Sequence, residues 1–349
     1  MIRGMSLKLN RKRIVIGGVL GITIILFIVT VWISAYFYKL SQQANISIPY
    51  LFRVYHESSE KMPLYTTTPI RFLILGLDQR SDSLENTLLT DTMLYGSLNV
   101  TKSKLTIVPI PRDIWIADLK TKVNSLYYYG TKQSKTSAPE YTESMLRQYF
   151  GITPNFFLTI NYAKLQTFID LLGGVDVAIA DSFVDPTFPN PAYVEHTSDP
   201  SISPYISISF REGTEHMDGN RALMFIRSRT SANPEEAGDS ARSNRQMFVI
   251  QSMLAKLRSR ETLTNPELLG KLYRFWHEAV GTNAADSDVL ALVRALGFQQ
   301  PTIVFDPIPT TETDSDAPLL FHPPVFKYGL WVWEPIDPSW KTIQAFFGN

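Results

Sequence analysis

The longest hydrophobic stretch of the chain lies near its N-terminus and contains no charged residue. It extends from Ile14 to Tyr38, between Arg13 and Lys39, and it is apolar on every helical face. As a helix it would be about 37 Å long, enough to cross a hydrocarbon layer of about 30 Å with some tilt. A cleaved signal peptide has a shorter apolar region and a small-residue cleavage site, which Ser34-Ala35-Tyr36 matches poorly. The pattern therefore predicts a transmembrane helix over residues 14–38.

Beyond residue 68, short apolar runs alternate with segments of helical periodicity. The runs predict strands, and the periodic segments predict helices. Residues 181–206 contain Pro, Ser and Asp without a clear period and are expected to form a surface loop. Residues 301–349 are rich in proline and should hold two strands and a terminal helix. Predicted strands cover 70–76, 92–98, 105–110 and 175–180, and predicted helices cover 141–150, 162–172, 218–226 and 239–257.

This alternation of strands and helices predicts an α/β fold. We expect one layered α-β-α sandwich domain with a mixed central sheet, preceded by the single transmembrane helix. At 349 residues the chain is long enough for one large domain or two ordinary ones. No internal repeat, GxGxxG segment or P-loop is present in the sequence.

The distribution of charge predicts how the chain is oriented in a membrane. Residues 1–40 carry six basic side chains and no acidic one, although the whole chain has 33 basic and 33 acidic residues. Positive charge before a span favours a cytoplasmic N-terminus. We therefore expect a cytoplasmic tail at 1–13, the span at 14–38, an extracytoplasmic stalk at 39–68 and an extracellular catalytic domain at 69–349.

Composition excludes several kinds of site. The chain has no cysteine, which excludes thiolate metal sites and cysteine nucleophiles. Its five histidines lack the paired spacing of a zinc hydrolase, so metal chemistry would rest on carboxylates. A net charge of zero provides no polycationic surface for nucleic acid, and we expect no nucleic-acid partner.

Two aspartates lie at the ends of predicted elements. Asp91 comes just before the strand at 92–98, and Asp239 begins the helix at 239–257. Mg²⁺ in proteins is often held by one or two carboxylates together with substrate phosphates. An aspartate at a helix start is equally typical of an N-cap, so both interpretations of Asp239 remain open.

Arginines are concentrated around the same elements. Guanidinium groups pair bidentately with phosphate oxygens, and a helix N-terminus also favours an anion. One helical face, whose continuation is apolar and which should therefore point into the protein, carries Arg242, Arg245, Gln246 and Val249. The alternative is a solvated or internally paired basic face. The arginines concerned are Arg112, Arg227, Arg229, Arg242 and Arg245.

Seven short segments occur in the order found in LytR-CpsA-Psr (LCP) proteins, which the chain resembles over roughly residues 69 to 349. Each is weak alone, but seven in order behind one N-terminal anchor are specific. The chain departs from the common pattern at Thr90, where serine is usual, and at Ser240, where an aromatic residue is frequent. The segments are 75–80, 90–93, 110–113, 122–124 with 129–130, 172–177, 217–229 and 238–246.

The resemblance implies an extracytoplasmic phosphotransferase. LCP enzymes move a glycopolymer from a polyprenyl-pyrophosphate lipid onto peptidoglycan, or another envelope acceptor, through a phosphodiester bond, and they enclose the lipid tail in an apolar pocket. The resemblance implies Mg²⁺ as cofactor, held by Asp91 and Asp239, and catalytic roles for Asp91, Arg112 and Asp239. It also implies a pyrophosphate cradle, supported by Asp113 and Lys122, that consists of Arg112, Arg227, Arg229, Arg242 and Gln246.

Two other functions remain open from the sequence. Water could replace the sugar hydroxyl as acceptor, which would make the protein a polyprenyl-pyrophosphate hydrolase. A lipid-binding or wall-scaffolding protein without turnover is the second alternative, and the retained pair of aspartates argues against it. Whether Asp91 binds metal, accepts a proton or does both is also open.

Overall fold

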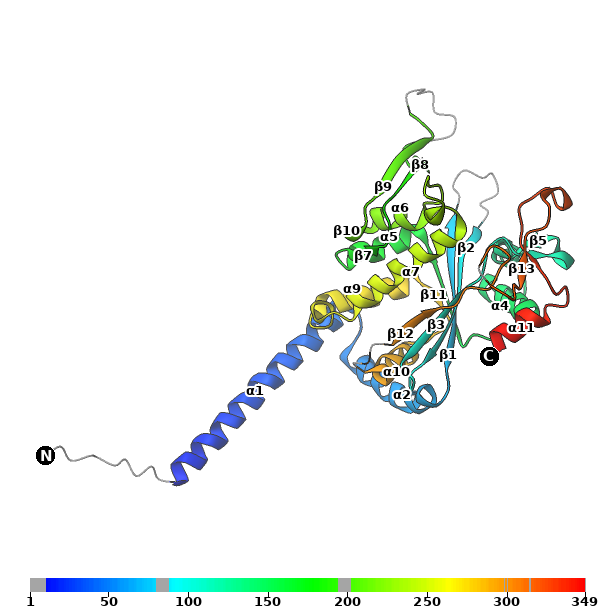
Figure 1. The fold of residues 1–349 in the computed structure, drawn as a ribbon. Coiled ribbons are helices and arrows are strands. Elements are labelled where there is room, and N and C mark those ends of the chain that lie inside the picture. The colour runs from blue at the N-terminus through cyan, green and yellow to red at the C-terminus, as the bar shows by residue number, and fades with distance from the viewer. Residues whose placement is uncertain are drawn as a thin grey trace.

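The fold was analysed in a computed structural model, which describes residues 11–79, 88–193, 202–297, 299, 301–313 and 315–348. Helix α1 (Arg11–Ala44) extends away from the domain, and α2 (Ile48–Thr67) packs along its lower edge (Figure 1). By length and composition the segment Leu20–Ala44 is able to span a membrane. The predicted stalk, residues 39–68, is formed by the end of α1 and by α2.

The centre of the domain is a six-stranded sheet in the order β11-β6-β1-β2-β3-β12. Neighbours β1 and β2 are antiparallel, as are β2 and β3, whereas β6 runs parallel to β1 and β12 parallel to β3. The sheet is therefore mixed, as predicted. Its strands are β1 (Ile70–Gln79), β2 (Leu88–Asn99), β3 (Lys104–Pro109), β6 (Phe156–Asn161), β11 (Gly281–Thr282) and β12 (Thr302–Phe305).

Helices cover both faces of this sheet, which confirms the α-β-α sandwich. Because side chains alternate along a strand, Leu73 and Leu75 of β1 pack on one side and Phe72 and Ile74 on the other. The first side is covered by α3 (Leu126–Thr131), α4 (Ala138–Phe150) and α11 (Lys341–Gly348). The second side is covered by α2, α7 (Gly238–Leu257) and α10 (Asp286–Leu296).

A second hydrophobic core lies beside the sheet. It joins α5 (Tyr162–Leu171), α6 (Gly219–Arg227) and the paired strands β7 (Val175–Ile179) and β10 (Gly213–Met217) to the inner end of α7. Because α7 contributes Val249 to this second core and Met247 to the core between the sheet and its covering helices, it joins the two cores.

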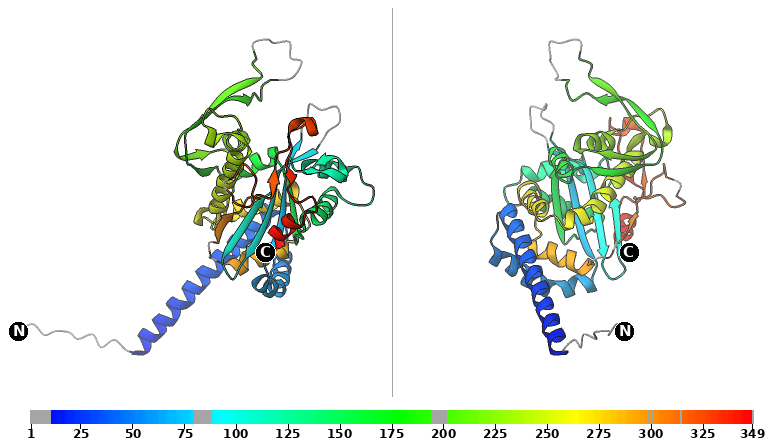
Figure 2. Two further views of the ribbon diagram at one scale, coloured as in Figure 1. Left: turned by 45° about the vertical axis from the view of Figure 1, so that its right-hand side comes forward. Right: turned by 90° about the vertical axis from the view of Figure 1, so that its left-hand side faces the viewer.

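One prediction for this region is wrong. Residues 181–206, expected as a loop, include strand β8 (Phe183–Pro189) and the first two residues of β9 (Tyr205–Phe210), and these strands form an antiparallel hairpin rising above the domain (Figures 1 and 2). Phe183, Asp185 and Phe188 are buried, but a register shift between Asp185 and Phe188 breaks the strict alternation. Pro186 and Pro189 further obscure the strand pattern in the sequence.

Candidate functional site

Asp91 lies at an irregularity inside β2. Gly76 pairs with Thr92 and Leu77 with Thr90, so Asp91 is an extra residue between the two pairs. Such bulges redirect side chains and are common beside active sites. The predicted position of Asp91, just before the strand, is therefore corrected, because β2 begins at Leu88. The residue is only 8% exposed.

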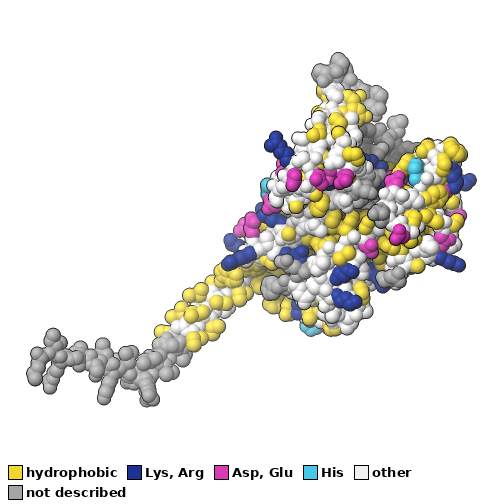
Figure 3. Space-filling view, in the orientation of Figure 1, with side chains coloured by type: hydrophobic (Ala, Val, Ile, Leu, Met, Phe, Trp, Pro, Cys, Tyr) yellow, Lys and Arg dark blue, Asp and Glu magenta, His cyan; other side chains and the backbone are white. Residues whose placement is uncertain are grey.

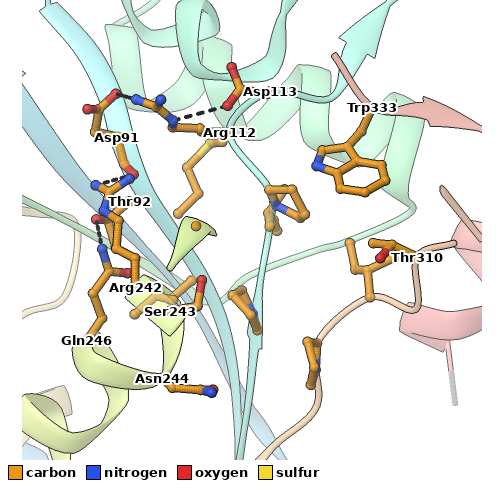
Figure 4. A pocket seen from close by; sticks show the side chains of 18 of the residues that line it. Asp91, Thr92, Arg112, Asp113, Arg242, Ser243, Asn244, Gln246, Thr310 and Trp333 are labelled. Atoms are coloured by element: carbon orange, nitrogen blue, oxygen red, sulfur yellow. Dashed lines mark hydrogen bonds and ion pairs between the residues drawn. The ribbon is translucent and has the colours of Figure 1, made fainter. Parts of the chain in front are cut away.

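Arg112 connects Asp91 to a second buried carboxylate. Its Nη1 lies 3.0 Å from Asp91 Oδ1, and its Nε lies 3.2 Å from Asp113 Oδ2. Lys122, on the short strand β5 (Thr121–Lys122), donates to Asp113 Oδ1 at 2.5 Å. Arg112 and Asp113 come shortly after β3, separated from it by Ile110 and Pro111, and Figure 4 shows Arg112 between the two aspartates. The four residues form a row of alternating charges, and Lys122 reaches Asp91 only through this row.

Helix α7 brings Arg242 and Gln246 to the same strand. Arg242 Nη2 donates to the backbone oxygen of Asp91 at 3.3 Å and to the hydroxyl of Tyr162 at 3.1 Å. Gln246 Nε2 donates to Thr92 Oγ1 at 3.2 Å. Arg242 is 4% exposed, which confirms that this face of α7 points inward.

Arg227 and Arg229 approach from the end of α6. Arg229 Nη2 lies 3.7 Å from Asp91 Oδ2, and the Arg227 guanidinium stacks over the Tyr162 ring at 5.5 Å. Asp185 of β8 holds this segment in place, since its Oδ2 accepts hydrogen bonds from Ser228 Oγ at 2.7 Å and from the Arg229 backbone N–H at 3.2 Å. The hairpin thus positions the arginines that follow α6.

The charges around Asp91 determine its protonation. Burial by itself would raise its pKa, but the positive charges of Arg112, Arg242 and Arg229 and the hydrogen bond from Arg112 outweigh burial. The pKa of Asp91 is therefore lowered below its ordinary value. The carboxylate is ionised at neutral pH.

Two cavities meet at Asp91 and Arg242, which line both. The larger, about 500 Å³, lies between β2, the segment after β3, the start of α7 and the C-terminal segment. In Figure 4, Trp333 and Thr310 stand across this cavity from Gln246 and Asn244. Its apolar lining includes Met93, Leu94, Ile110, Phe305, Ile308, Trp331 and Trp333.

The smaller cavity, about 240 Å³, is polar. It is lined by Arg227, Arg229 and Arg242 and by three aspartates, Asp78, Asp91 and Asp185, together with Tyr162. These formal charges cancel, so the small cavity offers many guanidinium donors without a net positive charge.

Two further residues of α7, Asp239 and Arg245, were candidates for the site from the sequence. Asp239 is the second residue of α7, whose N-cap is Ala237, and its side chain lies outside the described part of the structure. Arg245 faces inward but lines neither cavity, because it donates to Glu236 Oε2 at 2.6 Å and to the Ser228 backbone oxygen at 2.7 Å. Arg245 therefore joins α7 to the segment after α6.

Among the residues that the structure describes, no group of three or more His, Asp or Glu side chains is placed to hold a metal ion. Asp91 offers carboxylate oxygens, which suit a hard cation such as Mg²⁺. A cation at Asp91 would therefore share its coordination with ligand phosphates.

Sequence reasoning missed several residues of this site. Tyr162 contacts both Arg242 and Arg227, yet in the sequence it is only the first residue of a helix. Asp185 was included in the expected loop, and only the Phe183-x-Asp185 alternation could have indicated its inward position. Trp331 and Trp333 lie in a proline-rich segment without periodicity, so no sequence signal placed them beside α7.

Known proteins share this sequence pattern and fold. The polyisoprenyl-teichoic acid–peptidoglycan teichoic acid transferase TagU of Oceanobacillus iheyensis is 27% identical over 198 residues, covering 56% of this chain and 53% of the relative. The chain thus matches about half the length of that relative. The crystal structure of Bacillus subtilis TagU has a TM-score of 0.52 at 19% identity and covers 81% of this chain and 96% of its own. For the structure titled TagT bound to LIIa-WTA the values are 0.54, 15%, 82% and 91%.

At these low identities the solved structures show that the fold is shared, whereas the family is shown by the sequence match described next. Residues 38–324, most of the chain and nearly all of the sandwich domain, match the LytR_cpsA_psr family. The chain therefore belongs to the LytR_cpsA_psr family, as its seven segments predicted.

Proposed function

We propose that this protein transfers a glycopolymer from a polyprenyl-pyrophosphate carrier onto peptidoglycan, or another envelope acceptor, through a phosphodiester bond. The observation that carries the proposal is the junction, at Asp91 and Arg242, of a small arginine-lined cavity with a larger cavity whose lining is partly apolar. A lipid pyrophosphate has the same two parts, a compact anion and an isoprenoid chain. The name of the relative from Oceanobacillus iheyensis, a teichoic acid transferase, supports the same reaction.

The arginines would bind and orient the pyrophosphate. Arg227 and Arg229 are the more accessible, while Arg242 is fixed by Asp91 and Tyr162. Guanidinium groups hydrogen-bonded to phosphate oxygens stabilise the charge that collects on the leaving polyprenyl phosphate as the P–O bond of the pyrophosphate breaks. The apolar part of the larger cavity would enclose the first isoprenoid units and exclude water from the reacting phosphate.

Mg²⁺ is part of the proposal because of the charge balance in the small cavity. Its three arginines are offset by three aspartates, whereas a pyrophosphate brings two or more negative charges. Asp91 and Asp239 would hold the ion, which would supply positive charge and Lewis acidity to the phosphoryl group.

Asp91 suits the role of an electrostatic or metal-binding group better than that of a base. Its lowered pKa reduces its tendency to take a proton from a sugar hydroxyl. Its Oδ1 also already accepts a hydrogen bond from Arg112. We infer that Asp91 orients Arg112 and the cation and is not the base that takes the hydroxyl proton.

We further propose that α1 spans the cytoplasmic membrane once, with the catalytic domain outside. The apolar segment Leu20–Ala44 and the basic residues Arg11, Lys12 and Arg13 before it support this topology. Protease added to intact cells should degrade the domain and leave an anchor-containing fragment. Protection of the whole chain would contradict the topology.

The test of the reaction uses the full chain in detergent with a labelled polyprenyl-pyrophosphate glycan and peptidoglycan oligomers. We expect label on peptidoglycan, loss of transfer in Asp91→Asn, and retained transfer in Asp181→Asn, a change of the same kind at an exposed position outside both cavities. Chelation of Mg²⁺ should also weaken binding of the labelled lipid. Label released as free glycan phosphate would indicate a hydrolase, and binding without any turnover would indicate a scaffold.

A further inference from the structure

The anchor helix does not end where the predicted span ends. It continues to Ala44 and packs along α9 (Pro266–Ala279) at the edge of the domain (Figure 1). Tyr36 donates its hydroxyl to the backbone oxygen of Leu263 at 2.7 Å, and Lys39 Nζ lies 3.2 Å from Glu267 Oε1. Two contacts therefore join α1 to the region around the start of α9.

The two helices approach so closely that α9 requires a glycine at the crossing. A Cβ atom on Gly270 would lie 2.5 Å from Gln43 Cβ and 2.9 Å from the backbone oxygen of Leu40. Small residues at such crossings allow backbones to pack against each other. The contact with α1 is therefore shaped at the level of the backbone.

Helix α2 holds the membrane-proximal chain from a second side. Arg294 of α10 donates from Nη1 to the Tyr55 backbone oxygen at 3.1 Å and to Ser58 Oγ at 2.7 Å. Further along α2, the Tyr65 hydroxyl donates to Asp288 Oδ1 at 2.6 Å. Residues 39–68 are thus held on the domain at several points, and this fixes the direction in which α1 leaves it.

The length of the span sets the height of α8 (Arg260–Leu263) above the membrane. With Ile14 as the first residue in the hydrocarbon, about 20 residues at about 1.5 Å each cross a layer of about 30 Å, which ends near Ile33. Tyr36 then lies among the outer headgroups. Leu263, to which Tyr36 is hydrogen-bonded, must lie at the same level.

The surface at this level carries basic side chains around an exposed leucine. Glu261 is paired with Lys256 at 2.8 Å, and within the described part of the chain no acidic group forms an ion pair with Arg258 or Arg260. Leu263 is 43% exposed. Figure 3 shows Lys and Arg side chains bordering the place where the apolar surface of α1 meets the domain. Exposed arginines beside an apolar side chain match the headgroup region of an anionic bilayer.

We propose that residues 256–263, called here the membrane-facing turn, rest on the outer leaflet and bind anionic phospholipid headgroups. Arg258 and Arg260 bind the phosphates, and Leu263 enters the boundary of the acyl chains. The docked anchor and this turn together hold the domain at one height and tilt, so that the catalytic cavities keep a constant distance from the bilayer that holds the lipid substrate. The inference rests on the topology in the proposed function and is independent of the transfer chemistry.

The absence of cysteine allows a direct test with single-cysteine labels. A nitroxide is attached to Leu263→Cys or, as a control, to Phe326→Cys, a 90% exposed position five residues after β13 (Leu320–Phe321), a strand that lies away from α1 in Figure 1. The full chain is placed in nanodiscs of phosphatidylcholine with or without phosphatidylglycerol, and collision with a water-soluble paramagnetic reagent is measured. We expect the label at 263 to be several-fold less accessible than the label at 326, and least accessible with phosphatidylglycerol. Equal accessibility at both positions in both lipids would overturn the proposal.

Charge reversal separates headgroup binding from simple proximity. Arg258→Glu with Arg260→Glu should abolish the effect of phosphatidylglycerol at position 263, whereas Arg211→Glu, an exposed change between β9 and β10, should preserve it. Persistence of the lipid effect after charge reversal would refute headgroup binding by the arginines. Transfer in detergent, measured on the same proteins, should be unchanged by charge reversal. If the unmodified chain shows no transfer in detergent, the proposed function is contradicted, but the proposal that the membrane-facing turn binds headgroups is not.

Discussion

Replacement of Arg242 by alanine should lower both stability and ligand binding. The buried guanidinium donates to the Tyr162 hydroxyl at 3.1 Å and to two backbone oxygens, those of Asp91 at 3.3 Å and Ile226 at 3.4 Å. Each buried oxygen left without a donor costs about 1–3 kcal/mol. Tyr162 can turn to Thr92 Oγ1, which is 3.5 Å away, whereas the two backbone oxygens lose this donor.

Removal of the Arg242 charge has two opposing effects. Burial and, less strongly, the charge of Arg242 lower the pKa of Arg245, so the loss of Arg242 relieves a repulsion; but Asp91 also loses one of the positive charges that lower its pKa. We expect a net loss of about 2 kcal/mol in the free energy of unfolding. In a domain of this size the melting temperature should fall by about 4 °C.

Two other arginines serve as matched controls. The Arg229 side chain is 37% exposed and lies 3.7 Å from Asp91, so Arg229→Ala should change stability by at most about 0.5 kcal/mol while it weakens binding of a lipid pyrophosphate. Arg245 is buried but lines neither cavity, so Arg245→Ala should lower stability without a direct effect on the ligand.

The assay measures thermal unfolding of the full chain in detergent and, at a temperature where all variants are folded, binding of a fluorescent polyprenyl pyrophosphate. Arg242→Lys should retain some stability but bind weakly, because an ammonium group lacks the bidentate fork. If Arg242→Ala binds normally once folded, the phosphate role of Arg242 is wrong. If it melts like the unmodified chain, the hydrogen-bond argument is wrong.

Three further changes test the site. Both carboxylate oxygens of Asp185 accept hydrogen bonds, but in Asp185→Asn the amide nitrogen cannot accept one, so about 2 kcal/mol of stability should be lost. Ligand affinity should also fall, because Arg229 is displaced; unchanged melting and binding would contradict this. Because the folded pKa of Asp91 lies below its ordinary 3.8, its charge adds stability that is present above that value and lost as pH falls through the folded pKa. Stability of Asp91→Asn, measured by urea unfolding, should therefore fall less steeply than that of the unmodified chain between about pH 5 and pH 3, and parallel curves would refute the ion-pair account. Tyr162→Phe keeps the ring under Arg227 but loses the hydroxyl that accepts from Arg242, so lipid affinity should fall about tenfold, and an unchanged titration would show that Tyr162 only packs.

The local pattern of the sequence predicted the anchor helix and several central elements, but not β6, α9 or α10. The uncharged, largely apolar run from Ile14 to Tyr38 predicted a span, and the apolar runs at 70–76, 92–98 and 105–110 correspond to β1, β2 and β3. The spacing of Arg242, Gln246 and Val249 also predicted correctly that this face of α7 points inward. These features depend on residues close together in the chain, where helix and strand periods determine which side chains share a face.

Contacts between distant parts of the chain could not be predicted in this way. The bulge at Asp91 depends on the register between β1 and β2, and the position of Arg229 depends on Asp185, 44 residues earlier. The docking of α1 on α9 joins Tyr36 to Leu263 across 227 residues. Such contacts arise from the packing of complete elements, and no short pattern encodes them. The sequence by itself determined which residues carry charge and which elements hold them, while tertiary packing alone decided that those charges meet where a small arginine-lined cavity joins a larger, partly apolar one.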